Sequence, residues 1–145
     1  MYYTETELSE ALFIATKKIN NITKTCEVYT RGVNDCFAFL SEYDIQLRGK
    51  SKTIDFIKLP YNSPKEWYKQ LLKNNFTIES FAQHCGYEAL PSKRPKLGDV
   101  AFKDGSVMIA GKDFWQSTCD TNSGVRNYKQ IMFVERHLQI FRPRK

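Results

Sequence analysis

The sequence lacks any long apolar run and any leader-like start. None of its apolar stretches approaches the roughly 18 residues that a membrane span needs. Its first five residues, Met-Tyr-Tyr-Thr-Glu, have neither the basic region nor the apolar region of a secretory signal peptide. We therefore expect a protein that is made in the cytoplasm and has no membrane span.

Cysteine and histidine are scarce, which restricts metal and disulfide chemistry. The four cysteines and two histidines are Cys26, Cys36, Cys85, Cys119, His84 and His137. Without a C-x-x-C pair their spacing is not that of a zinc site, and in the cytoplasm disulfides are rare. Three aspartates, Asp99, Asp104 and Asp113, lie in or beside predicted turns, where Asp is favoured for local hydrogen bonding. We expect no metal ion and no cofactor.

The composition is that of one folded domain. The 145 residues are 41% hydrophobic, 26% charged and 14% aromatic, and the aromatic content argues against disorder. A chain of this length buries about two thirds of its unfolded surface, so it can form a core without disulfides or metals. We expect a single domain over residues 1–145.

Positive charge is in modest excess and gathers late in the chain. Twenty-two basic and 16 acidic residues give a net charge of +6, with basic clusters at 93–96 and 142–145. The second cluster predicts a short basic C-terminal segment, which is either a solvated, frayed end or a surface that docks on an acidic partner. Its docking candidates are Arg142, Arg144 and Lys145. Because no aromatic interleaving or nucleic-acid module accompanies the charge, a nucleic-acid partner rests on charge alone.

Helix signals occupy the first two thirds of the chain. Thr4 and Glu7 form a capping box for the first helix, which the apolar spacing extends to Ile19. Asp35 is a good N-cap for the second helix, and Gly49 suits its C′ position. The third helix starts at Pro64, and a fourth is predicted over residues 77–85.

Strand signals follow the helices. Residues 99–102, 107–110 and 114–118 read as three short strands separated by Lys-Asp-Gly and Gly-Lys-Asp turns, and residues 138–141 as a further extended segment. Helices followed by a meander of strands predict an α+β fold with N-terminal helices packed on a small antiparallel sheet. Trp115 on the third strand is either a core residue or an exposed anchor for a partner.

Cys36 is the main candidate for chemistry. Its place in the first turn of a predicted helix exposes it to the unpaired N–H groups there, which stabilise a thiolate over a thiol. A free cysteine is also commonly buried as a small apolar residue, so both interpretations stand at this point.

Two motifs point to a known family. Residues 32–40, Gly-Val-Asn-Asp-Cys-Phe-Ala-Phe-Leu, resemble the Asp-Cys-aromatic helix start of the NlpC-type branch of the papain-like fold. Residues 97–102, Leu-Gly-Asp-Val-Ala-Phe, are similar to the Gly-Asp strand that opens the sheet of that family. The resemblance spans about residues 30–118 and is greatest to the compact NlpC-like proteins encoded among phage tail genes.

The resemblance implies a papain-like fold and a cysteine peptidase or amidase that cleaves peptidoglycan stem peptides. Cys36 would be the nucleophile, and a histidine would take its proton and return it to the leaving amine. The family places that histidine at the start of the strand after the Gly-Asp strand, where this chain has Ser106. A serine hydroxyl is no base near neutral pH. His84 and His137 lie elsewhere in the sequence and are only remote candidates.

These observations predict a degenerate NlpC-like domain without enzymatic activity. It would serve as a structural component of a phage particle, in the tail, with other virion proteins as partners. It would be made in the host cytoplasm and end up in the virion. The alternative is an active hydrolase acting on peptidoglycan, with Cys36 served by His84 or His137.

Overall fold

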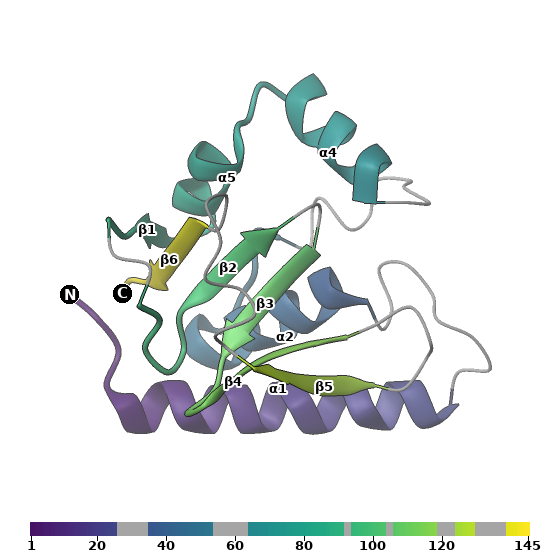
Figure 1. The fold of residues 1–145 in the computed structure, drawn as a ribbon, viewed down its shortest axis with the longest axis vertical. Helices are drawn as coiled ribbons and strands as arrows, with labels where there is room; N and C mark the ends of the chain where they lie inside the picture. The colour runs from purple at the N-terminus through teal and green to yellow at the C-terminus, as the bar shows by residue number, and fades with distance from the viewer. Residues whose placement is uncertain (26–34, 54–63, 92–93, 104–105, 119–123, 130–138) are drawn as a thin grey trace.

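The computed structural model describes residues 1–25, 35–53, 64–91, 94–103, 106–118, 124–129 and 139–145 (Figure 1). Helices come first and strands second, which confirms the α+β class. The helices are α1 Glu5–Thr25, α2 Cys36–Arg48, α4 Pro64–Lys73 and α5 Ile78–His84. The strands are β1 Tyr87–Ala89, β2 Val100–Lys103, β3 Ser106–Ala110, β4 Phe114–Thr118, β5 Val125–Lys129 and β6 Gln139–Pro143.

The described strands form one sheet in the order β1-β6-β2-β3-β4-β5, and every neighbouring pair is antiparallel. Strands β2, β3 and β4 form the predicted meander. The C-terminal strand β6 lies between β1 and β2, so its backbone is paired on both sides (Figure 1). The predicted last strand therefore extends two residues further than the sequence indicated, through Pro143.

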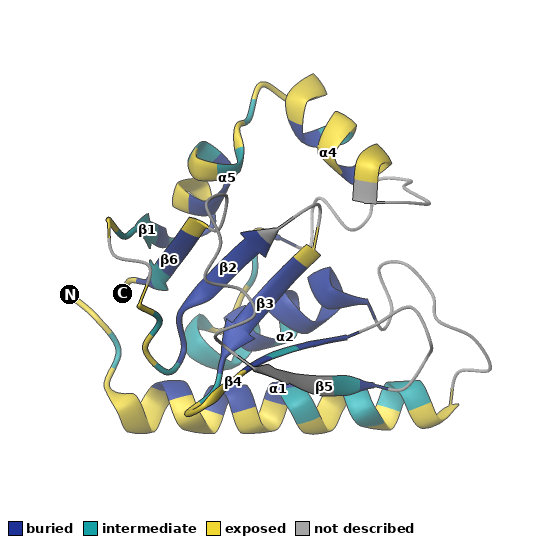
Figure 2. Cartoon of the chain, viewed as in Figure 1, coloured by how far each residue is buried: buried dark blue, intermediate teal, exposed yellow. Residues whose placement is uncertain are grey.

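Helices α1 and α2 pack on one face of the sheet. The inward residues of α1 are those that the sequence pattern predicts, including Leu8, Leu12 and Ile19 (Figure 2). On β2, Val100 and Phe102 join this helix-side core, whereas Ala101 between them belongs to a second cluster on the opposite face. This alternation follows from the two-residue period of a strand.

The first helix is longer than predicted. It continues to Thr25 instead of ending near Ile19. Asn20, which the sequence suggests as a stop, uses its side-chain oxygen to accept a hydrogen bond from the backbone N–H of Val125, at 2.8 Å. This hydrogen bond to β5 stabilises the helical conformation of Asn20, so tertiary contacts outweigh the weak helix propensity of asparagine.

The loop before β2 is held close to both N-terminal helices. Gly98 has a φ of +90°, a region that favours glycine. Its carbonyl accepts a hydrogen bond from the Tyr43 hydroxyl at 2.8 Å. A Cβ atom at this position would lie 2.8 Å from that hydroxyl and 2.9 Å from the Leu8 side chain. The Gly-Asp motif thus has a packing role in this chain.

Candidate functional site

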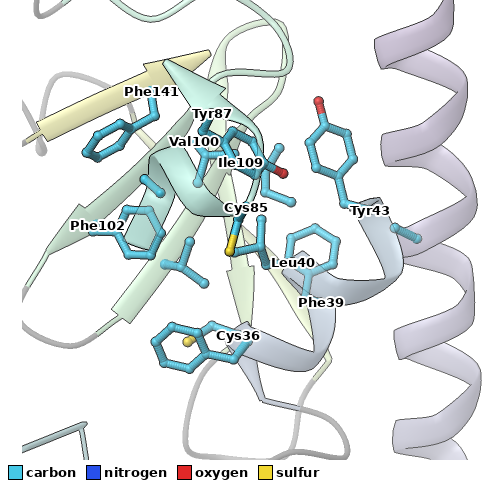
Figure 3. Packing of buried hydrophobic residues seen from close by; sticks show 14 of the residues in the cluster. Cys36, Phe39, Leu40, Tyr43, Cys85, Tyr87, Val100, Phe102, Ile109 and Phe141 are labelled. Atoms are coloured by element: carbon cyan, nitrogen blue, oxygen red, sulfur yellow. The ribbon is translucent and has the colours of Figure 1, made fainter. Parts of the chain in front are cut away.

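The predicted helix start at Cys36 is present. Asp35 has an extended backbone and caps α2, because its Oδ1 accepts a hydrogen bond from the N–H of Ala38 at 2.9 Å. Cys36 is the first residue of α2, and its thiol is free of any disulfide. The residue is only 4% exposed and belongs to the helix-side core with Phe39, Leu40 and Val100 (Figure 3).

Ser106 is the first residue of β3. From the sequence we expect it at the position where the NlpC-type family has its histidine. Ser106 is exposed and pairs in register with Lys103 across the β2–β3 hairpin. The next residue, Val107, is buried in the same core cluster as Cys36. Strand β3 therefore begins with an exposed hydroxyl and continues with a buried apolar residue.

His84 lies away from the start of α2. It ends α5, is exposed, and its ring is tilted against that of Phe76 with centroids 5.2 Å apart. Phe76 in turn contacts Phe81, which contacts Trp67, and Trp67 stacks on Phe37, the neighbour of Cys36, with ring centroids 4.1 Å apart. His137 lies outside the described residues.

Trp115 is not an anchor on the surface. Of the two interpretations left open by the sequence, the core residue is confirmed and the exposed docking candidate is wrong, because Trp115 is fully buried. It packs with Met108 and Ile140 on the face of the sheet opposite the two N-terminal helices. The strand β4 lies between β3 and β5, so it is not an edge strand of the sheet. The exposed aromatic on this strand is Phe114, at 41%.

The basic C-terminal segment is also not a free docking arm. Arg142 and Pro143 belong to β6, and the residues after them pair with the N-terminus. The N–H of Lys145 donates to the carbonyl of Met1 at 3.1 Å, and Tyr2 and Arg144 form an antiparallel bridge. We call residues 1–3 and 142–145 together the terminal clasp.

Each basic side chain of residues 142–145 has an acidic partner within the chain. Arg142 pairs with Asp99 through two hydrogen bonds, at 2.9 and 3.0 Å. Arg144 lies 3.7 Å from Glu88, and the Lys145 ammonium lies 3.2 Å from Glu7. The docking candidates predicted from the sequence are therefore occupied by intramolecular pairs, and their charge is partly neutralised.

A buried polar cluster beside the terminal clasp has no counterpart in the sequence prediction. Asp44 of α2 is fully buried. Its carboxylate accepts hydrogen bonds from the hydroxyls of Tyr87, Ser51 (2.9 Å) and Thr53 (3.1 Å), and the Arg48 guanidinium lies 3.8 Å away. Burial nevertheless raises the pKa of Asp44 to about 6, because desolvation outweighs these contacts.

One sequence signal could have found this cluster. Asp44 lies four residues after Leu40, on the helix face that the apolar pattern predicts as buried. A carboxylate there must find donors. Their identity was hidden, since Tyr87 comes from a strand 43 residues away.

The second buried free cysteine is Cys85. Cys85 contacts Thr53 at 3.6 Å, and burial raises the pKa of its thiol to about 12. Thiol chemistry near neutral pH needs the thiolate, and burial disfavours the thiolate of Cys85. Among the residues that the structure describes, no three His, Cys, Asp or Glu side chains gather as a metal site, and no helix is long and apolar enough to cross a membrane.

Comparison of the chain with protein-family models, with curated proteins and with solved structures gave no match.

Proposed function

We propose that the protein is a non-enzymatic structural component of a phage particle, in the tail, built on a degenerate NlpC-like fold. The observation that carries the proposal is the pair formed by a buried Cys36 at the start of α2 and an exposed Ser106 at the start of β3. The helix start of a cysteine hydrolase is retained, whereas the position of its base holds a hydroxyl.

The chemistry of cysteine hydrolysis supports this reading. The reaction needs a base within hydrogen-bond reach of the thiol. A serine hydroxyl does not supply one, and the contacts of His84 place it beside Phe76. Cys36 packs as a small apolar residue in the core, which is the usual place of a free cysteine without a catalytic role.

Exposed apolar side chains fit a protein that is covered by neighbours. Phe13 on α1 is 61% exposed, Leu72 on α4 is 49% exposed, and Phe114 on β4 is 41% exposed. Large aromatic side chains on a surface are favourable contact points for protein partners. In a virion they would pack against adjoining tail subunits.

The alternative of an active peptidoglycan hydrolase draws on the same helix start, where the N-terminal N–H groups of α2 favour a thiolate. It requires His84 or His137 to reach Cys36. The two proposals differ in the reactivity of one thiol.

Residue-resolved alkylation of Cys36 against pH separates them. A lone or buried thiol reacts only above about pH 8 or not at all, whereas reaction persisting well below about pH 6 requires an ion pair with a base. Mass spectrometry distinguishes Cys36 from the other three cysteines, and Cys36→Ser is the blank. Low-pH reactivity would overturn the non-enzymatic proposal.

Two further assays test the absence of hydrolase activity and the structural role in the virion. Digestion of peptidoglycan at high protein concentration, with Cys36→Ala as the control, should release no stem peptide. Pull-down with purified virion proteins should retain at least one tail component. A stable monomer with no affinity for any virion protein would contradict the structural role even if hydrolysis is absent.

A further inference from the structure

A cavity of about 560 Å³ opens beside the terminal clasp, far in the sequence from Cys36. Four segments converge on it: the N-terminus with the start of α1, the loop before β2, the turn between β3 and β4, and the end of β6. Its volume is within the range of about 300–1,000 Å³ that is typical of ligand sites. Convergence of four segments makes it a feature of the fold.

Part of the cavity lining is aromatic and apolar. Tyr2 and Tyr3 line it from the N-terminus, Leu8 from α1 and Leu97 from the loop before β2. Tyr2 is 48% exposed, and its hydroxyl donates a hydrogen bond to Glu88. These side chains offer a surface for an aliphatic or aromatic group.

The cavity lining also includes basic side chains. Lys96 and Lys112 line the cavity, and both are exposed. Within the described part of the chain, no ion pair joins either lysine to an acidic side chain. The one acidic residue in the lining is Glu5, so the lysines leave an excess of positive charge.

The cavity is held in shape without a ligand. Arg142 is fixed at its border by two hydrogen bonds to Asp99, whose side chain is only 1% exposed. The Arg142 guanidinium lies 5.8 Å from the ring centre of Tyr2, which places that aromatic side chain. A site formed in advance loses little conformational entropy on binding.

We propose that this cavity is a docking site for an acidic peptide segment of a partner protein, in which an Asp or Glu stands beside an aliphatic or aromatic residue. The carboxylate would lie between Lys96 and Lys112, and the apolar side chain against Tyr2, Leu8 and Leu97. The proposal goes beyond the function above and does not depend on it, because no step involves Cys36 or Ser106.

Fluorescence anisotropy of the full chain tests the site with the labelled peptide acetyl-Glu-Leu-Glu-Phe-amide. Saturable binding should weaken with rising salt. The double change Lys96→Glu and Lys112→Glu should weaken it at least about tenfold, because two attractive contacts become repulsive. Both lysines are exposed, so circular dichroism and thermal melting should show an unchanged fold.

The matched control is the double change Lys65→Glu and Lys69→Glu, at two exposed lysines on α4 outside the cavity. It changes the net charge equally and should leave the affinity within about twofold of the original. Equal weakening by this control would show attraction by net charge alone and overturn the proposal. Equal binding of the Gln-Leu-Gln-Phe peptide would also overturn the proposal. So would binding that does not saturate at peptide concentrations up to about 1 mM.

A competitor identifies the source of the carboxylate. Free N-acetylglutamate should displace the peptide only at a much higher concentration than unlabelled peptide does, because it lacks the apolar neighbour. Displacement at equal concentration would assign the cavity to small carboxylates and would refute peptide docking.

Discussion

Arg142, in the last strand, donates two hydrogen bonds to the carboxylate of Asp99, which precedes the second strand by one residue. Asp99 is 1% exposed and also accepts the backbone N–H of Lys96 at 2.8 Å. These bonds raise the pKa of Arg142. The pair joins β6 to the loop before β2 and forms one border of the proposed docking cavity.

Removal of this pair should destabilise the fold. Arg142→Ala leaves the Asp99 carboxylate buried without its cation, and breaking such a pair costs about 3 kcal/mol or more of unfolding free energy. Urea unfolding measures the loss. Arg144→Ala is the control: its pair with Glu88 is well exposed, so its removal should cost less than about 1 kcal/mol. Equal losses in the two variants would contradict a special role for Arg142.

Asp44 should make the protein less stable as pH rises from about 4 to 6. Its pKa is raised by burial to about 6 in the folded state, against about 3.9 in an unfolded chain. A raised acid pKa means that the folded state binds the proton more tightly. The contribution is complete below about pH 4 and is lost as pH passes 6, by roughly 3 kcal/mol in total.

The measurement for Asp44 is unfolding free energy against pH in the original chain and in Asp44→Asn. The variant should lose this decline between pH 4 and 6. A variant that keeps the full decline would show that another group causes it.

Gly98 and Gly49 form a matched pair for backbone strain and steric clash. Both have positive φ, +90° and +77°, but a Cβ at Gly49 meets nothing within 4 Å, whereas at Gly98 it meets Tyr43 and Leu8 below 3 Å. Gly49→Ala should cost about 1 kcal/mol of strain. Gly98→Ala should cost about 1–3 kcal/mol more, from displaced core side chains. Thermal or urea unfolding of both variants gives the difference, and equal costs would refute the close contact.

Truncation of the two neighbouring aromatic residues of β4 should change the unfolding free energy by very different amounts. Trp115 is fully buried, so Trp115→Ala should cost about 3–5 kcal/mol. Phe114 is 41% exposed, so Phe114→Ala should change stability by less than about 1 kcal/mol while weakening any partner contact through that surface. Unfolding measurements on the pair decide this, and a large loss for Phe114 alone would contradict the register of the strand.

Local signals in the sequence carried much of the fold. The hydrogen bonds between Thr4 and Glu7 are those of the predicted capping box, and Asp35 caps α2 as expected. Such bonds join residues three positions apart, so the chain itself holds both partners. The pairings of β2 with β3 and of β3 with β4 are local in the same sense, because each joins strands that are neighbours in the chain. The papain-like assignment goes further than these local signals and stays a prediction.

The sequence by itself determined where the four described helices begin to within about a residue, which faces are apolar, and that Cys36 opens a helix. Only the tertiary structure decided that β6 lies between β1 and β2, that Trp115 is buried, and which acid each terminal cation meets. The physical reason is distance along the chain. Caps, turns and periodicity depend on neighbours within a few residues, whereas the pairing of Arg142 with Asp99 or Tyr87 with Asp44 spans 43 residues and forms only when the whole sheet does.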